Sequence, residues 1–179
     1  MERKYIDYKE YSQTIIQALP KGILLTTKVE DKVNSMVIGW GTIGIIWGRP
    51  ICITYVREGR YTRELLDKSL EFTINTPLTE DVSNALRICG TQSGKNIDKV
   101  KECSFTLLDG EKVSVPAIQE FPLTLECKVL YRQPQVLENI PEEIRVRAYP
   151  QDVDSSNPGA NKDFHICYYG EIVNAYIVE

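Results

Sequence analysis

A block without a single ionisable side chain lies between Lys32 and Arg49, and it limits the possible folds of this chain more than any other stretch. Isoleucine, valine and threonine are dense in it, and glycines interrupt it at positions 39, 41, 44 and 48. β-Branched residues favour strands, and glycine inside such a run marks a bend. Because Pro50 restarts the pattern, the block predicts a strand, a glycine-rich bend and a second strand. It is too short and too polar for a membrane span, which needs about 20 apolar residues.

Arginines and hydroxyl groups follow the second predicted strand. Arg57, Arg60, Tyr61 and Thr62 stand directly before an apolar pattern that predicts a helix over residues 63–68, with Thr62 as its N-cap. A helix N-terminus offers free backbone N–H groups, and guanidinium groups beside it favour a phosphate dianion. The segment therefore indicates a phosphate site, and a solvated turn is the alternative interpretation.

Two motifs together resemble the flavin reductase-like family of FMN-binding split barrels. They are NSMVIGWG at residues 34–41 and RYT at residues 60–62, and the resemblance covers roughly residues 20–108 and 164–173. It implies an all-β or β-rich fold, an antiparallel Greek-key split barrel closed on itself, with a few short peripheral helices. We expect about six or seven strands and three helices, in one domain over residues 1–179.

The resemblance also implies FMN as the cofactor. In the family, the uncharged strand and loop line the flavin ring with backbone donors, and glycines such as those at 39, 41 and 44 let backbone amides approach it. The Arg-Tyr-Thr motif takes the phosphate. This chain departs from the family at Val37, at Glu58-Gly59 and at Lys95, where threonine, Pro-Ser and arginine are common. The expected cofactor-binding residues are Ser35, Met36, Val37, Ile38, Gly39, Trp40, Gly41, Thr54, Arg57, Arg60, Tyr61, Thr62, Ser93 and Lys95.

His165 is the only histidine, and with Gly170-Glu171-Ile172 it matches the closing motif of the family. The resemblance implies that His165 lies close to the flavin and nicotinamide site, which makes it the one candidate catalytic residue. A hydrogen-bonded scaffold histidine is the alternative. We expect Glu171 to be structural and to pair with an arginine of the central block.

The five cysteines form no CxxC motif, and they sit mostly inside apolar patterns. We expect them to be structural thiols, since free cysteine commonly behaves as a small buried hydrophobe. A redox pair of Cys89 and Cys103, or a zinc site, is the alternative. No metal ligands stand at metal-site spacing, so no metal is expected.

Charge and composition exclude other classes of protein. The net charge is −4 and the basic residues are scattered, which argues against a nucleic-acid surface. The first residues contain no apolar segment typical of a signal peptide, so we expect a cytoplasmic protein without membrane association.

The remaining pattern predicts one or two helical turns ending at Pro20, and a hairpin of residues 23–29 and 33–39. A helix after Thr79 carries the apolar stripe Val82, Ala85, Leu86 and Cys89 and ends near Gly90. A shorter helix is capped by Asn96 or Asp98. Residues 133–162 are irregular, and we interpret them as a flap near the ligand site rather than an uninvolved loop. Further strands are expected at residues 50–56, 70–75, 105–108, 113–115 and 123–132. The strand at 123–132 is expected to bury one face. Residues 164–178 predict two more strands, separated at Gly170.

The most favoured function is an NAD(P)H-dependent flavin reductase, which moves hydride from NADH or NADPH, a small-molecule electron donor, to flavin. The alternatives are an FMN electron carrier or redox sensor without nicotinamide activity, and a barrel without flavin that serves as an interaction module. The resemblance further implies a homodimer with FMN at its interface.

Overall fold

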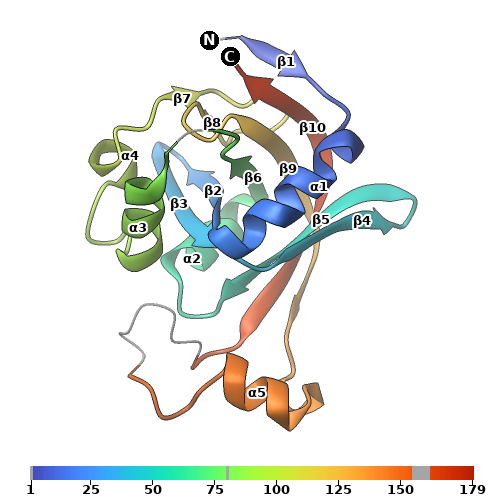
Figure 1. Cartoon of the computed structure of the whole chain (residues 1–179), viewed down its shortest axis with the longest axis vertical. Coiled ribbons are helices and arrows are strands. Elements are labelled where there is room, and N and C mark those ends of the chain that lie inside the picture. The colour runs from blue at the N-terminus through green and yellow to red at the C-terminus, as the bar shows by residue number, and fades with distance from the viewer. Residues whose placement is uncertain (1, 80, 155–161) are drawn as a thin grey trace.

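The computed structural model describes residues 2–79, 81–154 and 162–179. Its main feature is an eight-stranded antiparallel sheet, which is curved into a barrel in Figure 1. The prediction of a β-rich fold is confirmed, with more strands than the six or seven expected. The strands are β1 (Arg3–Tyr5), β2 (Ile23–Val29), β3 (Lys32–Ile38), β4 (Gly41–Ile46), β5 (Arg49–Arg57), β6 (Glu71–Thr76), β9 (Leu123–Pro134) and β10 (His165–Val178), beside a small pair, β7 (Leu107–Leu108) and β8 (Ala117–Ile118).

The strand order places the two halves of the uncharged block at opposite ends of the sheet. Neighbouring strands follow the order β3-β2-β6-β9-β10-β5-β4, and β1 pairs with β10. Only Gly39 and Trp40 connect β3 to β4, so these two residues cross from one end of the sheet to the other. This crossing holds the sheet in a barrel, although no ladder joins β3 to β4 among the described residues.

The helices lie around the sheet. Figure 1 shows α1 across the barrel, α3 and α4 together beside β3, and α5 projecting away from the body. Five α-helices replace the three expected, and none in the described ranges is long and apolar enough to cross a membrane. They are α1 (Tyr8–Ala18), α2 (Tyr61–Ser69), α3 (Ser83–Thr91), α4 (Lys99–Glu102) and α5 (Glu142–Ala148), with 3-10 turns η1 (Leu19–Lys21) and η2 (Leu137–Asn139).

Two main apolar clusters form the core, beside a third made of Ala117, Tyr176 and Val178. The larger fills the barrel, and its aromatic members Phe72 and Tyr168 are fully buried. The smaller lies between the sheet and α3, where the predicted stripe from Val82 to Cys89 packs as expected. Contrary to the prediction, α3 continues through Gly90 to Thr91, so Gly90 is not its end. Asp98 caps α4 by accepting from the N–H groups of Val100 and Lys101, which settles the choice between Asn96 and Asp98.

The sequence predicted a bend at the glycine-rich stretch, but this stretch forms the strand β4. The reversal comes after it, at Trp47 and Gly48, where φ is +54° and +69°. Glycine adopts positive φ without steric cost, so the turn settles there. Gly41 and Gly44 are paired with Thr54 and Ile51 in a regular ladder.

The closing run is one strand rather than two. At Gly170 the ladder with β9 shifts register, which marks a β-bulge. A Cβ atom at this position would come within 2.5 Å of the Phe72 ring. Gly170 is therefore needed for the close packing of Phe72, and β10 continues through it. Glu171 accepts two hydrogen bonds from Arg49 at 2.8 and 2.9 Å, the pairing expected for a structural carboxylate.

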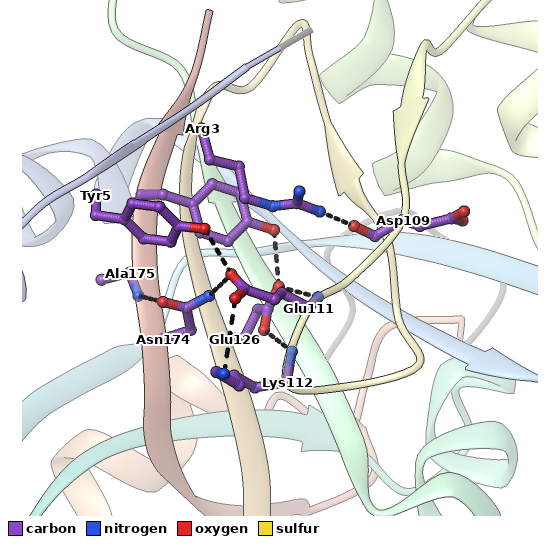
Figure 2. A network of polar contacts seen from close by, with 9 residues as sticks. Arg3, Tyr5, Asp109, Glu111, Lys112, Glu126, Asn174 and Ala175 are labelled. Atoms are coloured by element: carbon purple, nitrogen blue, oxygen red, sulfur yellow. Dashed lines mark hydrogen bonds and ion pairs between the residues drawn. The ribbon is translucent and has the colours of Figure 1, made fainter.

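The first half of β9 is buried on both faces, although one buried face was predicted. Glu126 is fully buried and accepts hydrogen bonds from the backbone N–H groups of Glu111 and Lys112 and from the Tyr176 hydroxyl (Figure 2). This carboxylate holds the segment around residue 111 over the outer face of the sheet. The strand predicted at 113–115 is absent, and that predicted at 105–108 shrinks to β7, because part of this segment bonds to side chains instead of a neighbouring strand.

Candidate functional site

Two adjoining cavities lie where β3, β5 and α2 meet. One has a volume of about 120 Å³ and reaches toward α3 and α4, and the other has about 140 Å³ and reaches toward His165. Met36, Val37 and Arg60 line both. The two cavities therefore form one elongated site that follows the end of the uncharged block.

The start of α2 differs from the prediction. The helix begins at Tyr61 with Arg60 at its N-cap position, so Thr62 is not the cap. Instead, the Thr62 hydroxyl accepts a hydrogen bond of 2.8 Å from the side-chain amide of Asn34 on β3. A hydroxyl that accepts still has its own proton to give. Thr62 lines the 120 Å³ cavity, so it is a hydrogen-bond donor for a group bound there.

A glycine brings the loop after α3 against β3. A Cβ atom on Gly94 would stand 1.9 Å from Oδ1 of Asn34, a distance at which no side chain fits. The close approach lets Ser93 and Gly94 line the cavity beside Thr62. The predicted role of Ser93 next to the phosphate motif is thus compatible with its position.

Lys99 is a site residue that the sequence analysis missed. Its side chain is 4% exposed, lines the 120 Å³ cavity and donates to the carbonyl oxygens of Ser35 and Cys89, each at 2.9 Å. No carboxylate pairs with it within the described ranges. Burial, together with the nearby Arg60, lowers the pKa of Lys99. Helix α4 has only four residues, which is too short for a helical period to show in the sequence, so the burial of Lys99 could not be predicted.

Lys95, the predicted counterpart of the family's arginine, lies elsewhere. Its ammonium forms an ion pair of 2.6 Å with Glu64 and lies 5.5 Å from the centre of the Tyr61 ring. It does not line either cavity. Because Glu64 pairs with Lys95, the Arg60 guanidinium is left without a hydrogen bond to the described side chains. Burial, reinforced by Arg57, lowers the pKa of Arg60.

Arg57, at the end of β5, is a buried guanidinium with spare donors. Its side chain lines the 140 Å³ cavity, and Nη1 has no hydrogen-bond partner among the described residues. Nε lies 3.5 Å from Oδ1 of Asp163, whose other oxygen accepts from the Gly59 N–H at 2.7 Å. Asp163 therefore closes the turn before α2 and leaves part of Arg57 facing the cavity.

His165 begins β10 and forms an aromatic group with Trp40 and Tyr149. The centres of the Trp40 and His165 rings are 4.5 Å apart at 34°, and the Tyr149 hydroxyl lies 3.1 Å from Nδ1. Burial is the largest cause that lowers the pKa of His165 to about 4, and the positive charge of Arg57 adds to it. The imidazole is neutral at physiological pH.

The segment of residues 133–162 partly fits the predicted flap. Tyr149, directly after α5, packs against both Trp40 and His165, so this part of the segment borders the site. Residues 155–161 lie outside the described residues.

Most of the predicted site residues meet at the two cavities. Three that do not line them are internal to the sheet: Ser35 bonds to Thr26, Gly41 lies in β4, and Thr54 is fully buried. Gly44 also lies away from the site, so Gly39 alone of the three glycines expected to approach a ring lines a cavity. The predicted residues that line the cavities are Met36, Val37, Ile38, Gly39, Trp40, Arg57, Arg60, Tyr61, Thr62, Ser93 and His165.

Cys89, which lines the 120 Å³ cavity, lies close to Cys103. Their Sγ atoms are 4.0 Å apart and unbonded. Burial raises the pKa of Cys89 to about 12 and also raises the pKa of Cys103. Both sulfurs are therefore held as thiols rather than as reactive thiolates, in keeping with a structural role.

The arrangement defines a β-rich split barrel with a ligand site at the crossing between its end strands. Solved structures share this fold. The flavoredoxin of Methanosarcina acetivorans is 25% identical, with a TM-score of 0.64 over 88% of this chain and 68% of its own. A protein of Shewanella frigidimarina with a split barrel domain is 14% identical, with a TM-score of 0.65 over 97% of this chain and 76% of its own.

The family follows from the sequence. The model for the family described as "Flavin reductase like domain" matches residues 17–179. The chain belongs to the flavin reductase-like family, which confirms the resemblance. An uncharacterized protein of Archaeoglobus fulgidus is 31% identical over 100 residues, which are 56% of this chain and 55% of that protein. The chain spans about half the length of the curated relatives it matches.

Proposed function

We propose that this protein binds FMN in the two cavities and transfers hydride from NADH or NADPH to it. One observation carries the proposal: Arg60 and Lys99 face the same cavity, and none of the described residues that line it is acidic. A buried ammonium without a counter-charge is costly, and an anion bound beside it offsets that cost. The family and the FMN-binding proteins among the structural neighbours support FMN as that anion.

The residues at the start of α2 suit the phosphate. Arg60 offers a planar guanidinium, Thr62 a hydroxyl proton, and the first turn of α2 its free N–H groups. Lys99 adds a second positive charge from the opposite wall. These groups come from β3, α2 and α4, so folding of the barrel is needed to bring them together.

The second cavity suits the flavin ring. The backbone from Met36 to Trp40 runs along it. Nη1 of Arg57, which has no partner among the described residues, can donate to a ligand atom on which negative charge develops. When bound, FMN supplies the redox chemistry by accepting the hydride. The chain itself positions the ring, excludes water with the Trp40 and Tyr55 side chains, and presents the Arg57 guanidinium. His165 is neutral and acts through hydrogen bonding rather than as an acid.

The steady-state test is oxidation of NADH and of NADPH with added FMN. We expect turnover with at least one of the two, and a strong loss in Arg60→Ala compared with the exposed control Lys101→Ala. Absence of nicotinamide oxidation with FMN bound would leave the electron carrier as the function. The 25% identity to a flavoredoxin favours that second candidate.

We also propose a homodimer. Side chains on the β4–β5 hairpin and on β9, which β10 separates from β5, leave an exposed apolar group, in which Ile45 is 63%, Trp47 60% and Tyr131 45% exposed. The Trp47 ring meets the Tyr131 ring edge-on at 88° and the Tyr169 ring at 44°, with ring centres 6.3 Å apart in each pair. Exposed apolar clusters of this kind commonly mark association surfaces, and Figure 1 shows the hairpin projecting from the barrel.

A further inference from the structure

The Tyr149 hydroxyl contacts two partners but has one proton. Its oxygen lies 2.5 Å from Oε1 of Gln135 and 3.1 Å from Nδ1 of His165. A separation of 2.5 Å fits an O–H···O hydrogen bond and is shorter than N–H···O bonds, so the oxygen of Gln135 faces Tyr149. An amide oxygen only accepts. Tyr149 therefore gives its proton to Gln135 and can only accept from His165.

We propose that Tyr149 and Gln135 fix His165 in the tautomer with the proton on Nδ1, so that Nε2 accepts a hydrogen bond from an N–H group of the ligand. Tyr149 and Gln135 are thus positioning residues that act through His165. The tautomer is independent of what the site binds. The nature of the ligand N–H group rests on the proposed function.

The surroundings keep the imidazole neutral and oriented. Burial is the largest cause that lowers the pKa of His165; the positive charge of Arg57 adds to it, Asp163 opposes it, and Arg60 adds least. Trp40 stacks on the ring at 4.5 Å, which restricts its rotation. The backbone N–H of Gln135 also donates to the carbonyl oxygen of His165 at 2.9 Å, so the two residues are tied together by main chain and side chain.

The free nitrogen faces the ligand site. His165 lines the 140 Å³ cavity and Tyr149 does not, so the nitrogen that Tyr149 does not engage is the one left for the ligand. Nε2 has no hydrogen-bond partner among the described residues. Beside it, Arg57 and Arg60 are donors only. His165 therefore offers an acceptor beside charged side chains that only donate, and it suits a ligand that carries an amide or imide N–H.

Two parts of the proposed reactants carry such a group, the imide of the flavin ring and the carboxamide of nicotinamide. A carboxylate in place of the carboxamide has no proton for Nε2. The site is therefore expected to bind NAD⁺ more tightly than the dinucleotide whose nicotinamide is replaced by nicotinic acid, if the carboxamide is the donor. If the flavin imide is the donor, FMN binds more tightly than its N3-methyl derivative.

Nitrogen-15 NMR of the ring tests the tautomer directly, because the chain has a single histidine. In protein without added ligand at neutral pH, we expect Nδ1 to give the signal of a protonated nitrogen and Nε2 that of a bare one. The reverse pattern, or the averaged signal of two exchanging tautomers, would overturn the proposal. No flavin activity enters this measurement.

Two substitutions at half-buried Gln135 separate positioning from general structure. In Gln135→Leu, Tyr149 loses its acceptor and is free to donate to Nδ1, so the proton moves toward Nε2. In Gln135→Glu the acceptor remains and the Nδ1–H signal persists. Tyr149→Phe removes the fixing group and gives mixed tautomers, while Tyr131→Phe, on β9 beside Trp47, gives the wild-type pattern. An unchanged tautomer in both Gln135→Leu and Tyr149→Phe contradicts the proposed role of the pair.

Ligand titration with the same labelled protein tests the acceptor. A hydrogen bond accepted by Nε2 moves its signal upfield, and we expect this with FMN or with NAD⁺, but not with the corresponding N3-methyl or nicotinic acid analogue. If FMN and NAD⁺ bind without moving Nε2, the acceptor role is wrong. If neither binds, the proposed function fails while the tautomer result stands on its own.

Discussion

The ammonium of Lys99 donates to the carbonyl oxygen of Ser35 across 64 residues of chain, at a distance of 2.9 Å. This bond ties the short helix α4 to β3 at the wall of the 120 Å³ cavity. It also orients a buried positive charge toward the place where Arg60 and Thr62 converge. The phosphate end of the proposed site is therefore built by a residue that pairs with backbone rather than with a carboxylate.

Replacing Lys99 by methionine is expected to weaken FMN binding by about ten- to a hundredfold, the effect of losing about 1.5–3 kcal/mol in a hydrogen bond to a charged group. Riboflavin, which has no phosphate, is expected to lose far less. Lys95→Met serves as the matched control, because Lys95 pairs with Glu64 outside the cavities. Fluorescence titration of wild type and of both variants with FMN and with riboflavin measures the dissociation constants. An equal loss for FMN and riboflavin would refute a phosphate role for Lys99.

Arg60→Ala is expected to show the same selectivity, with FMN weakened about ten- to a hundredfold and riboflavin much less. The reason is geometric, since a guanidinium donates two charge-assisted bonds to one phosphate. Arg57→Ala is the informative comparison, because Arg57 lines the other cavity and should weaken both flavins alike. If Arg57→Ala weakens FMN more than riboflavin while Arg60→Ala weakens both flavins equally, the phosphate contact belongs to Arg57 and not to Arg60.

We expect the free energy of unfolding to decrease in acid because His165 is protonated more readily in the unfolded chain. The pKa of His165 is lowered from 6.5 to about 4 by burial, so the unfolded chain takes up a proton before the folded one does. The free energy of unfolding therefore decreases as pH falls from 6.5 to about 4, by roughly 3 kcal/mol, and is unaffected by this group above that window. Urea unfolding of wild type and of His165→Gln on both sides of the window measures it. Equal pH dependence in the two proteins would show that His165 makes no such contribution.

The sequence predicted the parts of this fold that rest on local pattern. The hairpin of β2 and β3 and the stripe on α3 follow from spacing near in sequence. For the cap of α4 the sequence offers Asn96 or Asp98, and only the structure identifies Asp98. The family motifs located the site at β3 and α2. Both cavities confirm that these segments meet, since Met36, Val37 and Arg60 line each of them.

What the sequence could not show depends on contacts between distant segments. Burial of Lys99 follows from how α4 packs on β3, and the covering of both faces of β9 follows from the bonds of Glu126 to Glu111 and Lys112. The tautomer of His165 depends on Gln135 and Tyr149 in a segment without periodicity. Polar partners that meet only in the folded barrel leave no repeating pattern to read.

The proposed homodimer is expected to weaken when its apolar surface is made polar. Trp47→Ser should shift sedimentation equilibrium toward the monomer, because Trp47 is 60% exposed and its ring lies edge-on against the exposed Tyr131. Val146→Ser on α5, at 65% exposed, is the control and should leave the assembly unchanged. A wild-type mass of one chain in the presence of FMN would rule the dimer out.

Titration of the purified wild-type protein with FMN, followed by flavin absorbance and fluorescence, tests the central claim most directly. We expect saturable binding at one flavin per chain with a dissociation constant in the micromolar range or tighter, and competition by inorganic phosphate stronger against FMN than against riboflavin. Flavin absorbance and fluorescence that stay unchanged at FMN concentrations well above micromolar would contradict the account, and Arg60 and Lys99 would then serve a different anion.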